Sequence, residues 1–214
     1  EREARLSGGI YDKGVLIIAG WMRRMFAQDR PLSLTASLCF EQSYSGVDGD
    51  SASVAEIAAL LSELAGIPID CGLAVTGSVN QHGEVQPIGG VNEKVEGFFD
   101  LCLARGLTGR QGCVVPDRNV EDLMLRPDIV EAVAEGKFHV YAVGRVEDAI
   151  EILLGTPAGA RNEDGEFAEG TVFAAVEDKL DRYYRCAEGG DGDISPALLA
   201  ADQSGEAAKD GGRS

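Results

Sequence analysis

The sequence contains little of what is needed to hold a metal ion, a nucleotide or a lipid bilayer. Only two of its 214 residues are histidines, His82 and His139, and their wide separation argues against a zinc site. The phosphate-binding pattern GxxxxGK followed by Ser or Thr is missing, so we expect no ATP to be bound in that way. The longest apolar run, Gly14–Met22, is about half as long as a membrane-spanning helix. These absences exclude a phosphate-loop ATPase and argue against a membrane span.

Positive charge is also scarce. The sequence has 36 acidic and 19 basic residues, which give a formal net charge of −17 at pH 7. An acidic surface repels the phosphates of nucleic acids and of anionic lipids, so we expect neither as a partner. The five cysteines are odd in number and include no CxxC pair, which is typical of reduced thiols in a cytoplasmic protein. We therefore expect protein partners and a cytoplasmic location.

Changes in composition divide the chain into three parts. Residues 1–155 alternate between helical and strand periodicity and are predicted to form one domain. Residues 156–186 are predicted to be a polar, glycine-rich linker and an amphipathic helix, whose apolar residues would share one face: Val172, Phe173, Val176, Leu180 and Tyr184. Residues 187–214 are mostly Gly, Ala, Asp, Ser and Glu, and we expect a disordered acidic tail. The polar start without Met indicates a piece of a longer chain.

Within the first part, the periodicity predicts a mixed α/β domain whose helices pack on a sheet with at least one hairpin. Segments with a helical apolar stripe are predicted as helices: Lys13–Gln28, Ala52–Ala65, Val91–Arg105, Val120–Leu125 and Val146–Leu154. Short apolar or β-branched runs are predicted as strands: Leu32–Phe40, Ile69–Val79, Glu84–Ile88, Cys113–Val115 and Phe138–Val143.

The first segment with possible chemistry is Asp48–Ser51, which leads directly into the predicted helix Ala52–Ala65. One interpretation is an ordinary helix cap, because Asp or Ser at this place satisfies unpaired backbone N–H groups and stabilises by roughly 1 kcal/mol. The other is a serine nucleophile, because N–H groups and the helix dipole can stabilise an oxyanion there. The segment alone supplies no base, so both interpretations stay open.

The second segment, Gly83–Lys94, places Lys94 in the first turn of the predicted helix Val91–Arg105. The positive end of a helix dipole disfavours a charged amine, and burial there would lower the pKa of the lysine. That pKa, about 10.4 for a free lysine, must fall by about 3 before the amine can act as a base near neutral pH. From chemistry alone, a Ser51–Lys94 pair is one possibility among several.

Together the two segments resemble the proteolytic domain of Lon proteases. The resemblance rests on Asp48–Ser53 and Val75–Lys94, which occur in the family's order, and it extends over most of residues 7–155. Ser51 and Lys94 are 43 residues apart, as are the members of the family's catalytic dyad. This combination is far more specific than either segment alone.

Three positions depart from the commonest bacterial type of the family. Asp50 stands where that type has proline and Asn92 where it has lysine, which is similar to the Lon-like B and C branches. Glu56 is charged where the family signature has an apolar residue, which puts the local packing in question but not the dyad.

The resemblance implies an α/β fold similar to ribosomal protein S5 domain 2 and a serine endopeptidase that needs no cofactor or metal. Ser51 would be the nucleophile and Lys94 the general base. Thr76 matches a threonine that orients the lysine amine, although a strand threonine can equally bond to backbone. Asp48 and Asp50 match acidic positions, and because a carboxylate would hold Lys94 charged, we hypothesise that one of them pairs with it in a resting state.

The resemblance further implies a homo-oligomer, usually a hexameric ring, that degrades unfolded or damaged proteins. Proteins of the family commonly carry an ATPase module in the same polypeptide. This sequence does not contain one, so ATP is expected only at a separate module. The alternative is a Lon-like domain that forms a ring as a scaffold without proteolysis, as in the DNA-repair protein RadA. A third possibility is a latent peptidase that needs the missing module or the ring.

Overall fold

The centre of the molecule is a three-stranded parallel sheet in the order β1 (Leu73–Val75), β4 (Gly112–Pro116) and β5 (His139–Val143). The computed structural model describes residues 7–41 and 46–188. A separate antiparallel pair, β2 (Ser78–Val79) and β3 (Val85–Gln86), forms the predicted hairpin. The mixed α/β class is therefore confirmed. Most of the predicted tail lies outside the described residues.

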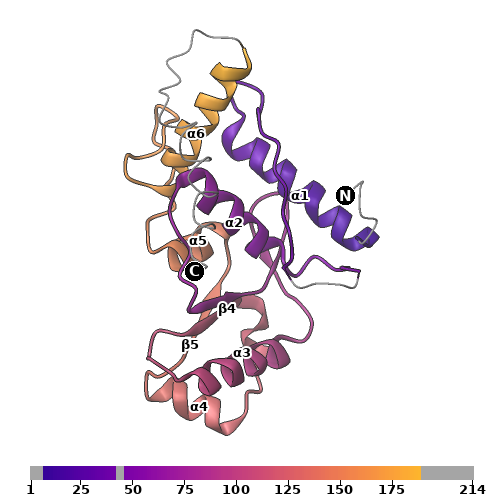
Figure 1. Ribbon diagram of the computed structural model, residues 1–214, viewed down its shortest axis with the longest axis vertical. Coiled ribbons are helices and arrows are strands. Elements are labelled where there is room, and N and C mark those ends of the chain that lie inside the picture. The colour runs from indigo at the N-terminus through magenta and orange to yellow at the C-terminus, as the bar shows by residue number, and fades with distance from the viewer. Residues whose placement is uncertain (1–6, 42–45, 189–214) are drawn as a thin grey trace, which may run out of the picture.

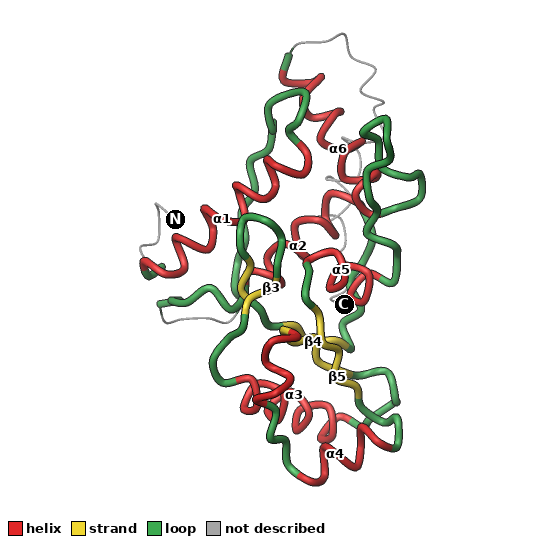
Figure 2. Tube along the Cα trace, turned by 180° about the vertical axis from the view of Figure 1, so that it is seen from behind, coloured by secondary structure: helices red, strands yellow, loops and turns green. Residues whose placement is uncertain are grey.

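Helices cover both faces of the parallel sheet (Figures 1 and 2). On one side, the described residues form α1 (Gly9–Phe26), α2 (Ser53–Ala65), α5 (Val146–Leu154) and α6 (Val172–Ala187). On the other side lie α3 (Val91–Arg105) and α4 (Pro127–Ala134), and the short 3-10 helix η1 (Asp117–Asp122) follows β4. Strand β4 alternates between the two layers, because Val114 packs in the first and Cys113 and Val115 in the second. We call these layers the larger core and the smaller core.

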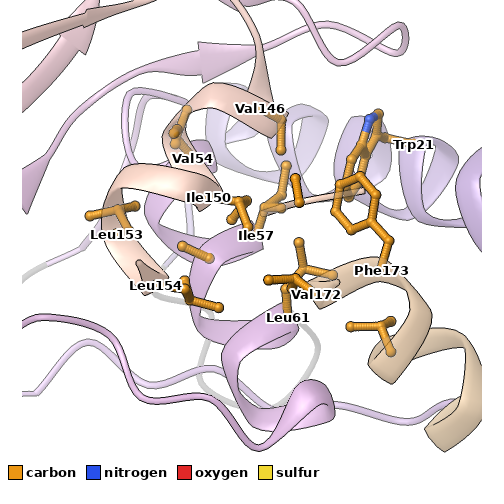
Figure 3. Close-up of a cluster of buried hydrophobic side chains, with 14 of the residues drawn as sticks. Trp21, Val54, Ile57, Leu61, Val146, Ile150, Leu153, Leu154, Val172 and Phe173 are labelled. Carbon is orange, nitrogen blue, oxygen red and sulfur yellow. The ribbon is translucent and has the colours of Figure 1, made fainter. Parts of the chain in front are cut away.

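The larger core joins the N-terminal helix to the C-terminal helix through aromatic rings. Trp21 and Phe173 are fully buried, with ring centroids 6.2 Å apart and planes at 67° (Figure 3). The backbone N–H of Phe173 donates to the carbonyl of Ala158, and Phe167 is buried in the same cluster. Residues 156–186 therefore pack against the same core as the segments before them.

Replacing Phe173 by alanine should lower the free energy of unfolding by about 3–5 kcal/mol, because a buried ring is lost and a cavity is left behind. Urea denaturation followed by circular dichroism measures the change. Leu16→Ala is the matched control, because Leu16 is 73% exposed and its loss should change stability by at most about 0.5 kcal/mol. Equal midpoints for the two variants would contradict a structural role for α6.

Helix α1 is 18 residues long and carries Asp12 in its first turn and Arg23 and Arg24 in its last. These charges complement the helix dipole at both ends. Within residues 7–41 and 46–188, no helix combines the length and the apolar character that crossing a membrane requires.

The predicted strand Leu32–Phe40 is wrong, because this segment pairs with no strand among the described residues. Leu32 and Leu34 pack instead against the larger core. Together with α2 and Tyr183 of α6, the segment lines a groove of about 380 Å³. Leu32 and Leu34 serve packing against the helices, which sequence periodicity does not distinguish from a buried strand.

The predicted strand Ile69–Val79 is divided into β1 and β2 at Gly77. The N–H of Gly77 donates to the carbonyl of Ser51 at 2.8 Å, and the N–H of Val54 donates to the carbonyl of Gly77 at 3.1 Å. Because these backbone groups pair with Ser51 and with Val54 in the first turn of α2, they do not continue the ladder with β4.

The predicted helix Val120–Leu125 is also wrong in type and position. The structure forms η1 there, and it places an unpredicted α-helix at Pro127–Ala134. Pro127 stands at the start of that helix, where proline is favoured because its missing N–H would have no partner anyway.

Candidate active site

Ser51 lies in the turn that precedes α2, two residues before the helix begins. The cap position is occupied by Ala52, which makes no side-chain capping bond. The hydroxyl of Ser53, not that of Ser51, bonds within the turn, where it donates to the carbonyl of Asp50 at 2.8 Å. The Ser51 side chain is therefore available for contacts outside its own helix.

A close backbone approach holds the Ser51 turn against the end of β1. The contact is made at Gly77, where an added Cβ would lie 2.9 Å from Val85 Cγ1 and 3.0 Å from Val54 Cγ2. Such distances are too short for a side chain, so only glycine lets the two segments meet. Gly77 thereby fixes how far Ser51 stands from the sheet.

Lys94 reaches Ser51 from the opposite layer. It stands in the first turn of α3, whose cap residue Gly90 has φ +68° and accepts a hydrogen bond from the Lys94 N–H. The Lys94 Nζ donates to Ser51 Oγ at 3.0 Å and to Thr76 Oγ1 at 3.2 Å. Partial burial of the amine lowers the pKa of Lys94 below its ordinary value of 10.5.

Thr76 makes both of the contacts that the sequence left open. Its hydroxyl donates to the carbonyl of Ser51 at 3.2 Å and accepts from Lys94 Nζ. Its backbone N–H donates to the carbonyl of Val114 in β4. Because the hydroxyl hydrogen is already used, Thr76 offers only lone pairs to the lysine, which turns the amine toward Ser51.

Asp48 and Asp50 do not contact Lys94, so the hypothesised resting pair is not formed in this structure. Asp48 Oδ1 accepts hydrogen bonds from the N–H groups of Ile10 and Tyr11, at 3.1 and 3.3 Å, and so caps α1. A hydrogen bond from the Gly49 N–H, followed by those from Tyr11 and Ile10, lowers the pKa of Asp48. The carboxylate is occupied by the start of a distant helix.

The cap predicts how stability depends on pH. Because the pKa of Asp48 is lower in the folded chain than its ordinary 3.8, its stabilisation is fully present above 3.8 and is lost as the pH falls through the folded value. Asp48→Ala should lower the melting temperature by a few degrees at pH 7, whereas Asp48→Asn, also a good cap, should change it less. Thermal denaturation of both variants between pH 7 and pH 3 tests this. The cap would be refuted if the melting curves of Asp48→Ala and Asp48→Asn coincided.

Ser51, Thr76 and Lys94 open into a cavity of about 350 Å³. The rest of its wall is apolar and comes from α2, α3, the parallel sheet and the segment before the Ser51 turn: Phe40, Ala52, Ala55, Ala74, Val75, Val95, Cys113, Val114 and Val115. Burial raises the pKa of Cys113 to about 12, so its thiol does not compete as a nucleophile. No cluster of three or more potential metal ligands occurs in the described part of the chain.

Comparison with known proteins shows which family has this arrangement. The model of the Lon protease (S16) C-terminal proteolytic domain matches residues 44–157, a range that contains Ser51, Thr76 and Lys94. This chain belongs to the Lon protease family. The Lon match begins just before the Ser51 turn and ends just after α5, and it therefore includes the whole parallel sheet.

Relatives with the same domain occur in bacteria and archaea. The protein named "Putative Lon protease homolog" of Escherichia coli (strain K12) is 50% identical over 72% of this chain, and its namesake from Haemophilus influenzae is 42% identical over 77%. The archaeal Lon protease of Archaeoglobus fulgidus is 36% identical over 54% of the chain and 17% of its own length. The chain spans about a quarter of the length of the two bacterial relatives, 26% and 27%.

The structure explains how this Lon domain accommodates Glu56 where the family signature has an apolar residue. Glu56 is buried in α2, burial raises the pKa of its carboxyl, and the Tyr11 side chain hydrogen-bonds to it. Its Oε1 has no partner among the described residues. Helix α2 runs unbroken through Glu56, and the contact between Lys94 and Ser51 is formed. The branch assignment from Asp50 and Asn92 stays a prediction.

Sequence reasoning missed two residues that shape the site. Phe40 was assigned to a strand, and no pattern in the sequence placed its ring at the cavity beside Ser51. Gly77 belongs to the motif Val75–Lys94, but its role depends on an approach to Val54 that only the folded chain brings about. A glycine inside a predicted strand was the available signal.

Proposed function

We propose that this chain is a serine endopeptidase in which Ser51 is the nucleophile and Lys94 the general base. The supporting observation is the 3.0 Å distance between Lys94 Nζ and Ser51 Oγ, which is short enough for direct proton transfer. The partly buried amine has a lowered pKa, as a lysine base requires.

The reaction proceeds in two halves. Neutral Lys94 removes the Ser51 proton while Oγ attacks the peptide carbonyl carbon, and a tetrahedral intermediate forms. The ammonium of Lys94 then gives its proton to the departing amine as the C–N bond breaks, which leaves an acyl-enzyme. Water attacks the ester carbonyl, with Lys94 again accepting a proton, and Ser51 regains its hydrogen when the acid product leaves.

The oxyanion is assigned to backbone N–H groups at the start of α2. The amides of Ser53 and Val54 already donate to backbone carbonyls, so this role falls to the preceding amides, those of Ser51 and Ala52. The positive end of the α2 dipole adds to the stabilisation of the negative charge. Thr76 keeps the lysine amine directed at Ser51 through the reaction.

The substrates proposed are unfolded or damaged proteins, which enter as extended segments. A hexameric ring of this chain would enclose the sites, and ATP would act only at a separate ATPase module. The relatives carry Lon protease names and are about four times as long as the matched segment, which leaves room for further modules. The five cysteines, all free, favour the cytoplasm, and no cofactor takes part in the proposed chemistry.

The test is an incubation of the purified chain with an unfolded protein, with and without ATP, beside a fluorophosphonate probe that reacts with activated serines. We expect peptide fragments and a probe adduct that mass spectrometry locates on Ser51. Fragments without an adduct on Ser51 would refute the assigned nucleophile. If the incubation yields neither fragments nor an adduct, the result would favour the non-proteolytic scaffold.

A further inference from the structure

The connection that leads into α3 has little to fix it in place by itself. It consists of Gly89 and Gly90, both exposed, and a Cβ added at Gly89 would meet no atom within 4 Å. Paired glycines leave the backbone more freedom than any other residues do. The position of Lys94, four residues further on, therefore depends on contacts that reach α3 from elsewhere.

Asn119 supplies the contacts nearest to this connection. It lies in η1, is only 4% exposed, and uses both ends of its amide on one residue, Ile88, which directly precedes the two glycines. Its Oδ1 accepts from the Ile88 N–H at 2.9 Å, and its Nδ2 donates to the Ile88 carbonyl at 3.1 Å. The same Nδ2 donates to Asp122 Oδ2 at 3.2 Å. The side chain thus pairs with Ile88 as a neighbouring strand would.

The residues after Asn119 continue along the first turns of α3. Asn92 Nδ2 donates to the carbonyl of Asp122 at 3.0 Å, and Asn92 Oδ1 accepts from the N–H of Met124 at 2.7 Å. The N–H of Arg126 donates to Glu96 Oε1 at 3.1 Å. Residues 119–126, which we call the strap, therefore follow α3 on both sides of Lys94.

The strap is anchored to the strand that also holds Thr76. Strand β4 ends at Pro116, three residues before Asn119, and its Val114 carbonyl accepts the N–H of Thr76. Strand β4 therefore sets the position of the Thr76 hydroxyl, which accepts from Lys94 Nζ. Through Asn119 it also sets the position of α3, the helix that carries Lys94. The 3.0 and 3.2 Å contacts of Nζ depend on both.

We propose that Asn119 is a positioning residue for Lys94, which holds the start of α3 at the distance from Ser51 that proton transfer requires. The proposal rests on the proposed peptidase function. Asn119 does not line the cavity and does not touch the reacting atoms. Without its amide, Ile88 loses both backbone partners, the glycine connection relaxes, and the Lys94 amine withdraws from Ser51 and Thr76.

Asn119→Ala should lower kcat for peptide hydrolysis by about 100-fold, as a displacement of roughly 1 Å does at other active sites. KM should change little, because the cavity wall comes from other residues. Asn119→Asp keeps the acceptor for the Ile88 N–H but places an oxygen opposite two acceptors, the Ile88 carbonyl and Asp122 Oδ2, so its loss should be at least as large. The readout specific to positioning is the pKa of the Lys94 amine, measured by pH-dependent acetylation and mass spectrometry. It should rise in both variants as the amine becomes hydrated.

Phe173→Leu is the matched control, because it loosens the larger core across the sheet and touches neither α3 nor the strap. It should leave kcat and the Lys94 pKa as in the wild type at temperatures where all variants are folded. The proposal is overturned if the Asn119 variants keep the wild-type kcat or Lys94 pKa, or if Phe173→Leu moves them equally. A wild-type chain without hydrolysis would refute the proposed function alone, since acetylation of Lys94 still measures its position.

Discussion

Replacing Lys94 by methionine is expected to lower kcat for peptide hydrolysis by at least about 10⁴-fold. Methionine occupies similar space on the same helix, but its thioether is not basic enough to take the Ser51 proton, which the lysine amine can reach across the present 3.0 Å. The cavity and both cores stay filled, so stability should change little. Hydrolysis of an unfolded protein under single-turnover conditions measures the loss.

Lys94→Arg is the informative companion variant, because it keeps the positive charge and length but cannot become neutral, since the arginine pKa exceeds 12. It should be as inactive as Lys94→Met. In the wild type, the rate should rise with pH as Lys94 loses its proton, and the lowered pKa places this rise below 10.5. Wild-type rates in Lys94→Arg would show that the residue acts through charge and not as a base.

Replacing Ser51 by alanine is expected to abolish hydrolysis, with a loss of at least about 10⁴-fold, because the other hydroxyl beside Lys94, that of Thr76, donates its hydrogen to the backbone carbonyl of residue 51. The fold should be unaffected, since Ser51 contributes to it through its carbonyl, which accepts from Gly77 and Thr76. The buried Cys113 thiol is no substitute, because its pKa is raised to about 12.

Ser53→Ala is a close control for this variant. It removes a hydroxyl two residues away that bonds only to the turn carbonyl of Asp50, so it should cost some stability and leave hydrolysis largely intact. Hydrolysis and thermal denaturation are measured for both variants side by side. A Ser51→Ala chain that still cleaves, or a Ser53→Ala chain as inactive as it, would contradict the assigned nucleophile.

The two helices that position the dyad could be predicted well from the sequence. Gly66 ends α2, and the Gly89-Gly90 pair precedes α3, as local capping rules require. Such signals are local, so they are visible without the fold. The pairing of Ser51 with Lys94 was predicted only through the family resemblance, because nothing in either segment alone indicates that the other lies beside it.

The role of Asp48 shows where sequence reasoning stops. The hypothesis that Asp48 or Asp50 pairs with Lys94 uses only their closeness to Ser51 in the sequence, whereas the Asp48 carboxylate caps α1 by accepting from Ile10, 38 residues earlier in the chain. Asn119 was overlooked for the same reason, since its partner Ile88 is 31 residues away. Periodicity and motif spacing describe neighbours along the chain, whereas these side chains are engaged by backbone groups that only the folded topology brings near.

Under the proposed mechanism, the nucleophile turn belongs to the layer of α1, α2, α5 and α6 and the base to α3 in the other layer, and their side chains meet 3.0 Å apart beside Thr76. Peptide hydrolysis by this mechanism therefore requires both layers to be folded, and neither layer alone contains the whole site. Under the proposed mechanism, a newly synthesised chain in which only one layer has formed is proteolytically silent. A protease built in this way cannot cut itself or its neighbours before its own folding is finished.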